Sequence, residues 1–140
     1  MILFFFNVCA SLDKHCRELP GGLEVIVSTW DKALSLAVDS SESAQALIYR
    51  GTIIKRMNTP SALECAKRDI EEGLSLINSE RDHDLTVLGI YNMACIFGLQ
   101  GHLDESIKYI SQLKSITSES KYVEYQKKIL NYFPQLDGVI

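Results

Sequence analysis

The segment from Ile90 to Leu113, IYNMACIFGLQGHLDESIKYISQL, constrains the fold of this chain more than any other. Large apolar residues recur in it at the spacing of one helical face, and small residues stand where a second helix must approach closely. Gly101 interrupts the apolar pattern, as a residue free to adopt positive φ can at a helix end. The segment therefore predicts two antiparallel helices joined by a tight turn.

This hairpin resembles a tetratricopeptide repeat, whose pattern W-x2-L-G-x2-Y…A-x3-F alternates large and small residues because each first helix packs closely against its own second helix. The residues at the six pattern positions are Ile90, Met93, Ala94, Phe97, Ser106 and Ile110, and Leu113 takes the next packing position. Where the first helix differs from the family pattern, the residue present has the same size class as the residue that it replaces. The terminal Pro of the family is absent. The resemblance implies a superhelix of helical hairpins whose inner face binds another protein.

Weaker copies of the same pattern lie upstream. One copy has its first helix at Leu47, Arg50, Gly51 and Ile54 and its second at Ala66, Ile70 and Gly73. A further trace, at residues 5–12, parallels residues 90–97. The copies recur at about 42 to 43 residues, which is longer than the usual 34 of this family and falls in the range of other helical repeats.

Apolar periodicity and helix-breaking residues predict seven helices and no strand. Their approximate ranges are 2–17, 23–39, 43–57, 60–78, 84–100, 103–117 and 120–133. Ser40 to Ser43 supply cap-type residues for the third helix, Thr59 and Pro60 start the fourth, and Ser118 or Ser120 caps the seventh.

The last segment, KYVEYQKKILNYFPQLDGVI, loosely resembles the closing segment of several bacterial tetratricopeptide proteins. Such a segment is needed because an open array must cover the apolar face of its last hairpin. We therefore predict an all-α fold in one domain, residues 1–140, as a tetratricopeptide-like α–α superhelix of about three hairpins plus a C-terminal capping helix.

Composition excludes some classes of function. Hydrophobic residues make up 46% and charged residues 23%, which are ordinary globular values, and the net charge of −4 argues against nucleic-acid binding. The apolar run from Met1 to Leu12 lacks a preceding Lys or Arg and is shorter than a membrane span, so we expect a buried first helix. A targeting signal is the alternative for this run, and no membrane association is expected.

No familiar catalytic or cofactor-binding motif occurs in the sequence, so we expect neither an enzyme nor a cofactor. The four cysteines, Cys9, Cys16, Cys65 and Cys95, lack the paired short spacing of a zinc site. We therefore expect buried, reduced thiols, no metal, and a cytoplasmic protein. A weaker alternative is a metal or nucleophile site that joins His15 to Cys9 and Cys16.

The resemblance places several polar residues on the inner face formed by the first helices. The candidates for binding are Asn7, Tyr49, Thr52, Lys55, Arg56 and Asn92. It implies that Asn7 and Asn92 hydrogen-bond the backbone of an extended peptide; capping a loop or bridging two helices is the alternative. With Arg50, the basic candidates Lys55 and Arg56 suggest a carboxylate-binding patch.

An acidic stripe on the fourth helix supports a second hypothesis. Its residues are Glu64, Asp69, Glu71 and Glu72, with Lys67 and Arg68 between them. Solvated ion pairs explain this pattern, but it also suits an inhibitor such as a toxin-immunity protein that blocks a basic bacterial toxin. Our leading hypothesis is a non-enzymatic module that binds another protein or peptide through its inner face.

Overall fold

All regular elements in the described part of the chain are helical. The computed structural model describes residues 7, 8, 11, 12, 15 and 18–140. Its elements are α2 (Gly22–Ser35), α3 (Ser40–Lys55), α4 (Pro60–Ser75), α5 (His83–Leu99), α6 (Leu103–Ile116), α7 (Glu119–Tyr132) and the short 3-10 helix η1 (Pro134–Leu136). The predicted all-α fold is confirmed, while most of the predicted helix at 2–17 lies outside the described residues.

Side-chain caps explain where the helices begin. Thr59 Oγ1 accepts a hydrogen bond from the Ala62 N–H at the start of α4. The Ser118 hydroxyl accepts one from the Lys121 N–H at the start of α7. Both caps agree with the prediction. The prediction for α3 was wrong by three residues, because Asp39, and not a serine of 40–43, is the cap and accepts from the Glu42 N–H at 2.8 Å. The backbone of Asp39 is extended and not helical. Helix α2, which was predicted to run to residue 39, accordingly ends earlier, at Ser35.

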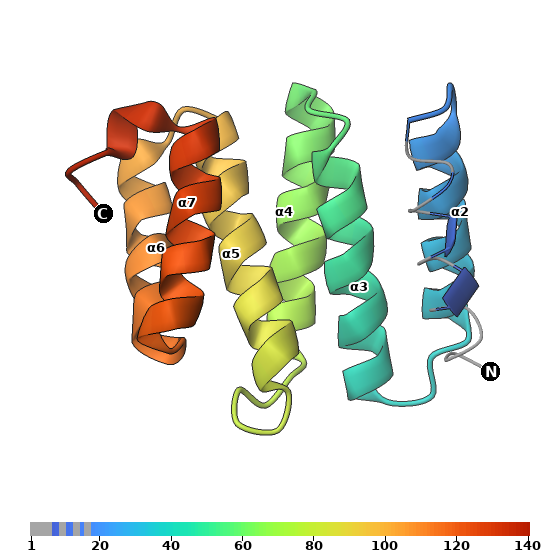
Figure 1. Cartoon of the computed structure of the whole chain (residues 1–140). Helices are drawn as coiled ribbons and strands as arrows, with labels where there is room; N and C mark the ends of the chain where they lie inside the picture. The colour runs from blue at the N-terminus through green and yellow to red at the C-terminus, as the bar shows by residue number, and fades with distance from the viewer. Residues whose placement is uncertain (1–6, 9–10, 13–14, 16–17) are drawn as a thin grey trace.

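The helices stand side by side as a row of antiparallel hairpins (Figure 1). Hairpins α3–α4 and α5–α6 each pack internally, and α5 contacts both helices of the preceding hairpin. Helix α7 follows on the other side of α5, where the Tyr125 ring lies 4.9 Å from the Tyr91 ring. We refer to α3, α5 and α7 as the inner helices; all three end at the same side of the molecule.

Two glycines allow α3 and α4 to approach closely. A Cβ atom on Gly51 would lie 2.7 Å from Ile70 Cγ1 and 2.9 Å from the Ala66 carbonyl oxygen. In return, a Cβ atom on Gly73 would lie 2.6 Å from Ile48 Cγ1. Each helix therefore places an isoleucine over the glycine of the other, which is the alternation of large and small residues that the sequence predicts.

The α5–α6 hairpin uses slightly larger residues at the same kind of contact. Ala94 and Ser106 are both buried, and Ser106 Oγ donates a 2.8 Å hydrogen bond to the Ala94 carbonyl oxygen. Gly101 occupies the turn with φ of 82°, which an L-residue with a side chain rarely adopts. The predicted packing of Ala94 against Ser106 is confirmed.

The C-terminal segment covers the last hairpin. The Phe133 ring lies against Gly98 of α5, where a Cβ atom would lie 2.7 Å from its Cζ. Ile129 and Leu136 are buried in the same cluster as Ile110, and Gln126 Nε2 donates a 3.0 Å hydrogen bond to the Ile140 carbonyl oxygen. Helix α7 and the residues after it thus act as the predicted cap.

We predict that Gly51→Ala destabilises the protein by about 1–3 kcal/mol, because the new methyl group would overlap the Ala66 backbone. This loss would occur although Ala is favoured over Gly within a helix by about 1 kcal/mol. Urea unfolding would measure it. Gly89→Ala is the matched control, since its nearest neighbour is the partly exposed side chain of Leu74, which can move. Equal effects of the two substitutions would contradict this account of the α3–α4 contact.

Candidate protein-binding groove

A hollow of about 480 Å³ opens between the inner helices. Its lining residues, which define what we call the inner groove, are Thr52, Lys55, Arg56, Asn58, Leu88, Tyr91, Asn92, Cys95, Leu99, Tyr132 and Phe133. Four of the six residues predicted for the inner face lie here: Thr52, Lys55, Arg56 and Asn92. The groove therefore brings together side chains that are up to 81 positions apart in the sequence, from Thr52 to Phe133.

Lys55 and Asn92 connect two of the inner helices. Lys55 Nζ donates a 2.6 Å hydrogen bond to Asn92 Oδ1 and lies 5.8 Å from the centre of the Tyr91 ring. Asn92 is 1% exposed, and its Nδ2 donates to the Leu88 carbonyl oxygen at 2.9 Å. Asn92 thus bridges α3 and α5, which is the structural role given above as an alternative to peptide binding. Its role in binding a partner stays a prediction.

Burial controls the protonation behaviour of the groove. It lowers the pKa of the Lys55 ammonium, which Cys95 raises and Arg56 lowers further. Burial also raises the pKa of the Cys95 thiol, against the opposing influence of Lys55 and a hydrogen bond with Tyr91. Because a thiol with a raised pKa stays protonated near neutral pH, Cys95 is a poor nucleophile. This chemistry suits recognition better than covalent catalysis.

Two predicted residues of the inner face lie outside the groove lining. Tyr49 stacks on Trp30 of α2, with ring centres 5.1 Å apart and planes 6° from parallel. Asn7 is an exposed residue with helical backbone in the part of the N-terminal segment that is described. Neither residue belongs to the set that lines the inner groove.

Arg50 does not join the basic patch that the sequence suggested. Its Nε and Nη2 each donate a 2.8 Å hydrogen bond to the Asp69 carboxylate, and its Nη1 donates to Asp31 at 3.0 Å. These bonds tie α3 to α4 and α2, so Arg50 is a structural residue. The prediction that it adds to a carboxylate-binding surface is therefore wrong.

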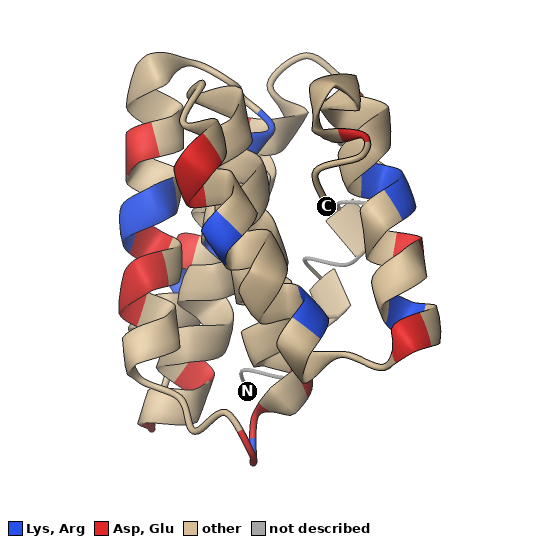
Figure 2. Cartoon of the chain, turned by 90° about the vertical axis from the view of Figure 1, so that its left-hand side faces the viewer, with Lys and Arg blue, Asp and Glu red and all other residues tan. Residues whose placement is uncertain are grey.

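The acidic stripe is partly neutralised within the protein. Asp69 binds Arg50, and Glu64 accepts hydrogen bonds from Lys67 at 3.1 Å and from Gln100 at 2.8 Å. Glu71 and Glu72 are exposed. Acidic and basic residues alternate along the helices seen in Figure 2, which agrees with the explanation of the stripe by solvated ion pairs.

An apolar wall of the groove was not predicted as part of the site. Tyr91, Leu99, Tyr132 and Phe133 form it, and Tyr132 keeps 67% of its surface exposed. The apolar pattern of the closing helix predicts that both Tyr132 and Phe133 belong to its apolar face. Two adjacent residues at the end of a helix point in different directions, so both aromatic side chains cannot face one core. The sequence therefore indicated that one of the two faces outward, but not which one.

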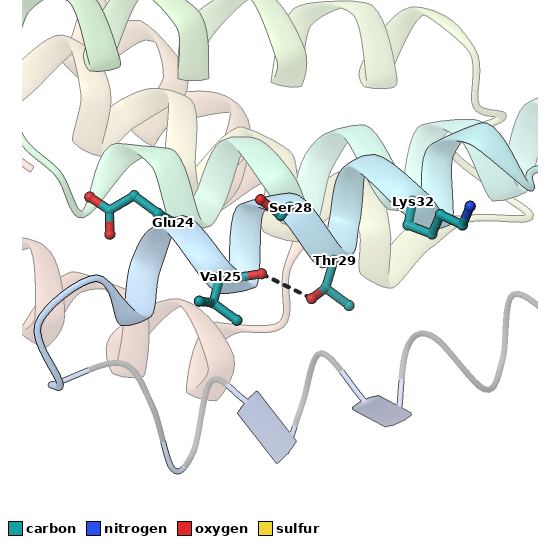
Figure 3. Close-up of a pocket in the computed structure, with 5 residues that line it drawn as sticks. All are labelled: Glu24, Val25, Ser28, Thr29 and Lys32. Atoms are coloured by element: carbon teal, nitrogen blue, oxygen red, sulfur yellow. Dashed lines mark hydrogen bonds between the residues drawn. The ribbon is translucent and has the colours of Figure 1, made fainter.

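A second hollow, of about 450 Å³, lies along α2. Glu24, Val25, Ser28, Thr29 and Lys32 line it, and all five come from this one helix (Figure 3). Thr29 Oγ1 donates to the Val25 carbonyl oxygen at 2.9 Å, so its hydroxyl is engaged within the helix. Among the described residues, side chains from separate helices do not converge here, which makes the inner groove the stronger candidate.

The thiols differ from expectation in one respect. Cys95 is buried as predicted, but Cys65 is exposed on α4 and the expectation of burial is wrong for it. Cys9 and Cys16 lie outside the described residues, so the alternative site that joins them to the exposed His15 stays a prediction. Among the residues that are described, three or more His, Cys, Asp or Glu side chains nowhere gather in a way that could hold a metal ion.

Comparison with known proteins leaves the family open. No family model, no curated protein and no solved structure matches the chain. Within the described ranges, each helix is too short or too polar to cross a membrane. Function must therefore be inferred from the groove itself.

We predict that Asn92→Ala lowers the free energy of unfolding by about 2 kcal/mol, since it removes the hydrogen-bond acceptor of a partly buried ammonium. Thr52→Val is the matched control. The Thr52 hydroxyl lies in the same groove but donates only to the Ile48 carbonyl oxygen of its own helix, so its loss should change stability little. Equal stability of Asn92→Ala and the wild type would show that the bridge contributes nothing.

Alkaline unfolding should report on Tyr91. Burial, followed by the influence of Cys95, raises the pKa of its phenol above the ordinary value of 10.0. The unfolded chain then releases this proton first, so the stabilising contribution is complete below pH 10 and is lost as pH rises above it. We expect wild type to lose more stability than Tyr91→Phe between pH 9 and pH 11, as measured by urea unfolding. Parallel losses would contradict a buried phenol.

Proposed function

We propose that the chain is a non-enzymatic interaction module that binds a segment of a partner protein in the inner groove. The observation that carries this proposal is the convergence of cationic, amide and aromatic side chains from three separate helices on one hollow. Tyr and Arg are enriched among the residues that dominate binding energy at interfaces. The volume of about 480 Å³ lies in the range of ordinary ligand sites.

The groove is held in shape before a partner arrives. The Lys55–Asn92 hydrogen bond fixes α3 against α5, and the contact of Phe133 with Gly98 fixes the end of α7 against α5. A preformed site avoids part of the entropy cost of ordering side chains on binding. An extended segment lying across the inner helices could touch all three without rearranging the protein.

The inhibitor hypothesis gains no support of its own from the arrangement of the acidic stripe. Asp69 and Glu64 are engaged in ion pairs and hydrogen bonds within the chain, although Glu64 is itself exposed. Glu71 and Glu72 are the other exposed residues of the stripe. The experiment below therefore treats binding of a basic partner to α4 as a separate outcome.

Photo-crosslinking tests the proposal in cells of the source organism. A photoreactive phenylalanine analogue replacing Tyr132 would lie in the groove, and the same analogue replacing Val123 would lie elsewhere on α7, where Val123 is 39% exposed. We expect a discrete crosslinked protein from position 132 only. We further expect Tyr132→Ala to weaken the purified complex by about 1 kcal/mol or more without changing the melting temperature.

Two results would contradict the proposal. One is crosslinking of the same partner from position 123 but not from position 132. The other is unchanged affinity of Tyr132→Ala combined with loss of binding in Glu71→Lys and Glu72→Lys, which would favour a basic partner bound through the acidic stripe.

A further inference from the structure

One amine is held inside the inner groove by a fixed hydrogen bond. Lys55 Nζ donates to Asn92 Oδ1 at 2.6 Å, and Asn92 Nδ2 in turn donates to the Leu88 carbonyl oxygen at 2.9 Å. Asn92 is 1% exposed, so both ends of its amide are positioned by the protein. Lys55 is half-buried and lines the hollow of about 480 Å³. Its nitrogen therefore has a defined place in a groove that a small molecule can enter.

The surroundings of this nitrogen shift it toward its uncharged form. Burial is the main cause that lowers the pKa of Lys55 below its ordinary value of 10.5, and the Arg56 guanidinium lowers it further. Cys95 acts in the opposite direction only as a thiolate, and burial raises the pKa of the Cys95 thiol. A lysine that is desolvated and lies near another cation is the kind of amine that reacts with carbonyl compounds.

An aromatic surface lies within reach of the same nitrogen. Lys55 Nζ lies over the Tyr91 ring, 5.8 Å from its centre. The Tyr91 ring also packs against the Tyr125 ring, with centres 4.9 Å apart, so it is held in place. An aromatic group joined to Nζ through a single carbon atom would therefore lie against Tyr91, and neighbouring aromatic rings attract one another beyond simple burial.

From this geometry we infer that Lys55 forms a reversible imine with an aldehyde that carries an aromatic ring, and that the inner groove is the binding site of this ligand. The inference goes beyond the proposed function and does not depend on it, although the ligand and a partner segment would share the groove. Imine formation here is a binding event, because hydrolysis of the C=N bond returns both reactants unchanged.

The reaction balances without an oxidant or a reductant. The lone pair of the neutral Lys55 amine attacks the aldehyde carbon and a C–N bond forms, while the carbonyl oxygen takes the proton that the nitrogen gives up. The new hydroxyl group accepts one proton from solvent and leaves as water, and the nitrogen lone pair completes the C=N bond. The protonated imine keeps a single N–H, which Asn92 Oδ1 is placed to accept.

Reductive trapping on the folded full chain at pH 7 tests the inference. Benzaldehyde is the aromatic probe, acetaldehyde is the matched aldehyde without a ring, and cyanoborohydride converts each imine to a stable amine. Lys127, which is exposed on α7 and is not a lining residue of the groove, is the internal control. Peptide mass spectrometry should show benzaldehyde on Lys55 at least about threefold faster than on Lys127, and a smaller ratio of the two rates with acetaldehyde.

Two variants should assign the reaction to this site. Lys55→Arg keeps the positive charge but forms no imine under these conditions, so labelling at position 55 should vanish while labelling of Lys127 stays the same. Tyr91→Leu removes the ring, so the ratio of Lys55 to Lys127 labelling should fall at least about twofold with benzaldehyde and should not fall with acetaldehyde. If Tyr91→Leu disturbs the fold, as measured by circular dichroism, the two aldehydes compared on the wild type decide the matter.

Two results would overturn the inference. With benzaldehyde, a rate at Lys55 equal to or below the rate at Lys127 would show that the groove amine has no special reactivity. A preference for Lys55 that is the same with both aldehydes would show a reactive amine without a site for an aromatic ligand. Either result would leave the proposed function standing.

Discussion

The reciprocal contact between α3 and α4 determines where the rest of the described chain can lie. Ile70 packs over Gly51 and Ile48 packs over Gly73, at distances that leave no room for a methyl group on either glycine. This interlocking fixes the separation and register of the hairpin, and α5 then packs against both of its helices. Because the inner groove forms between α3, α5 and α7, its width follows from contacts on the opposite side of α3.

The same design is repeated with different residues at the next hairpin. Ala94 and Ser106 take the place of the glycines, and the Ser106 hydroxyl satisfies its hydrogen-bonding need on the Ala94 carbonyl oxygen. A buried polar group is tolerated there because it is paired. The row of hairpins then ends at Phe133 and Leu136, which close its apolar side.

Most of the described fold could be predicted from local sequence patterns, and much of the groove could not. Helix boundaries followed from caps such as Thr59 and Ser118, and close helix contacts followed from small residues at regular spacing. The assignment failed for Arg50, because only the structure reveals that Asp31 and Asp69 converge on it from two other helices. Tyr132 was placed with the cap for a similar reason, since a sequence does not reveal which of two adjacent aromatic residues faces outward.

Three properties distinguish the inner groove: a partly buried cation bridged to Asn92, an exposed aromatic wall, and a lining that contains neither Asp nor Glu among the described residues. Together they support the proposal that a partner binds to the inner helices and not to α4 or α6. Mapping amide chemical shifts by NMR while titrating a bound peptide tests this claim most directly. The account predicts the largest changes in α3 near Lys55, in α5 near Asn92 and at the end of α7. Changes confined to α4 and α6 would contradict it.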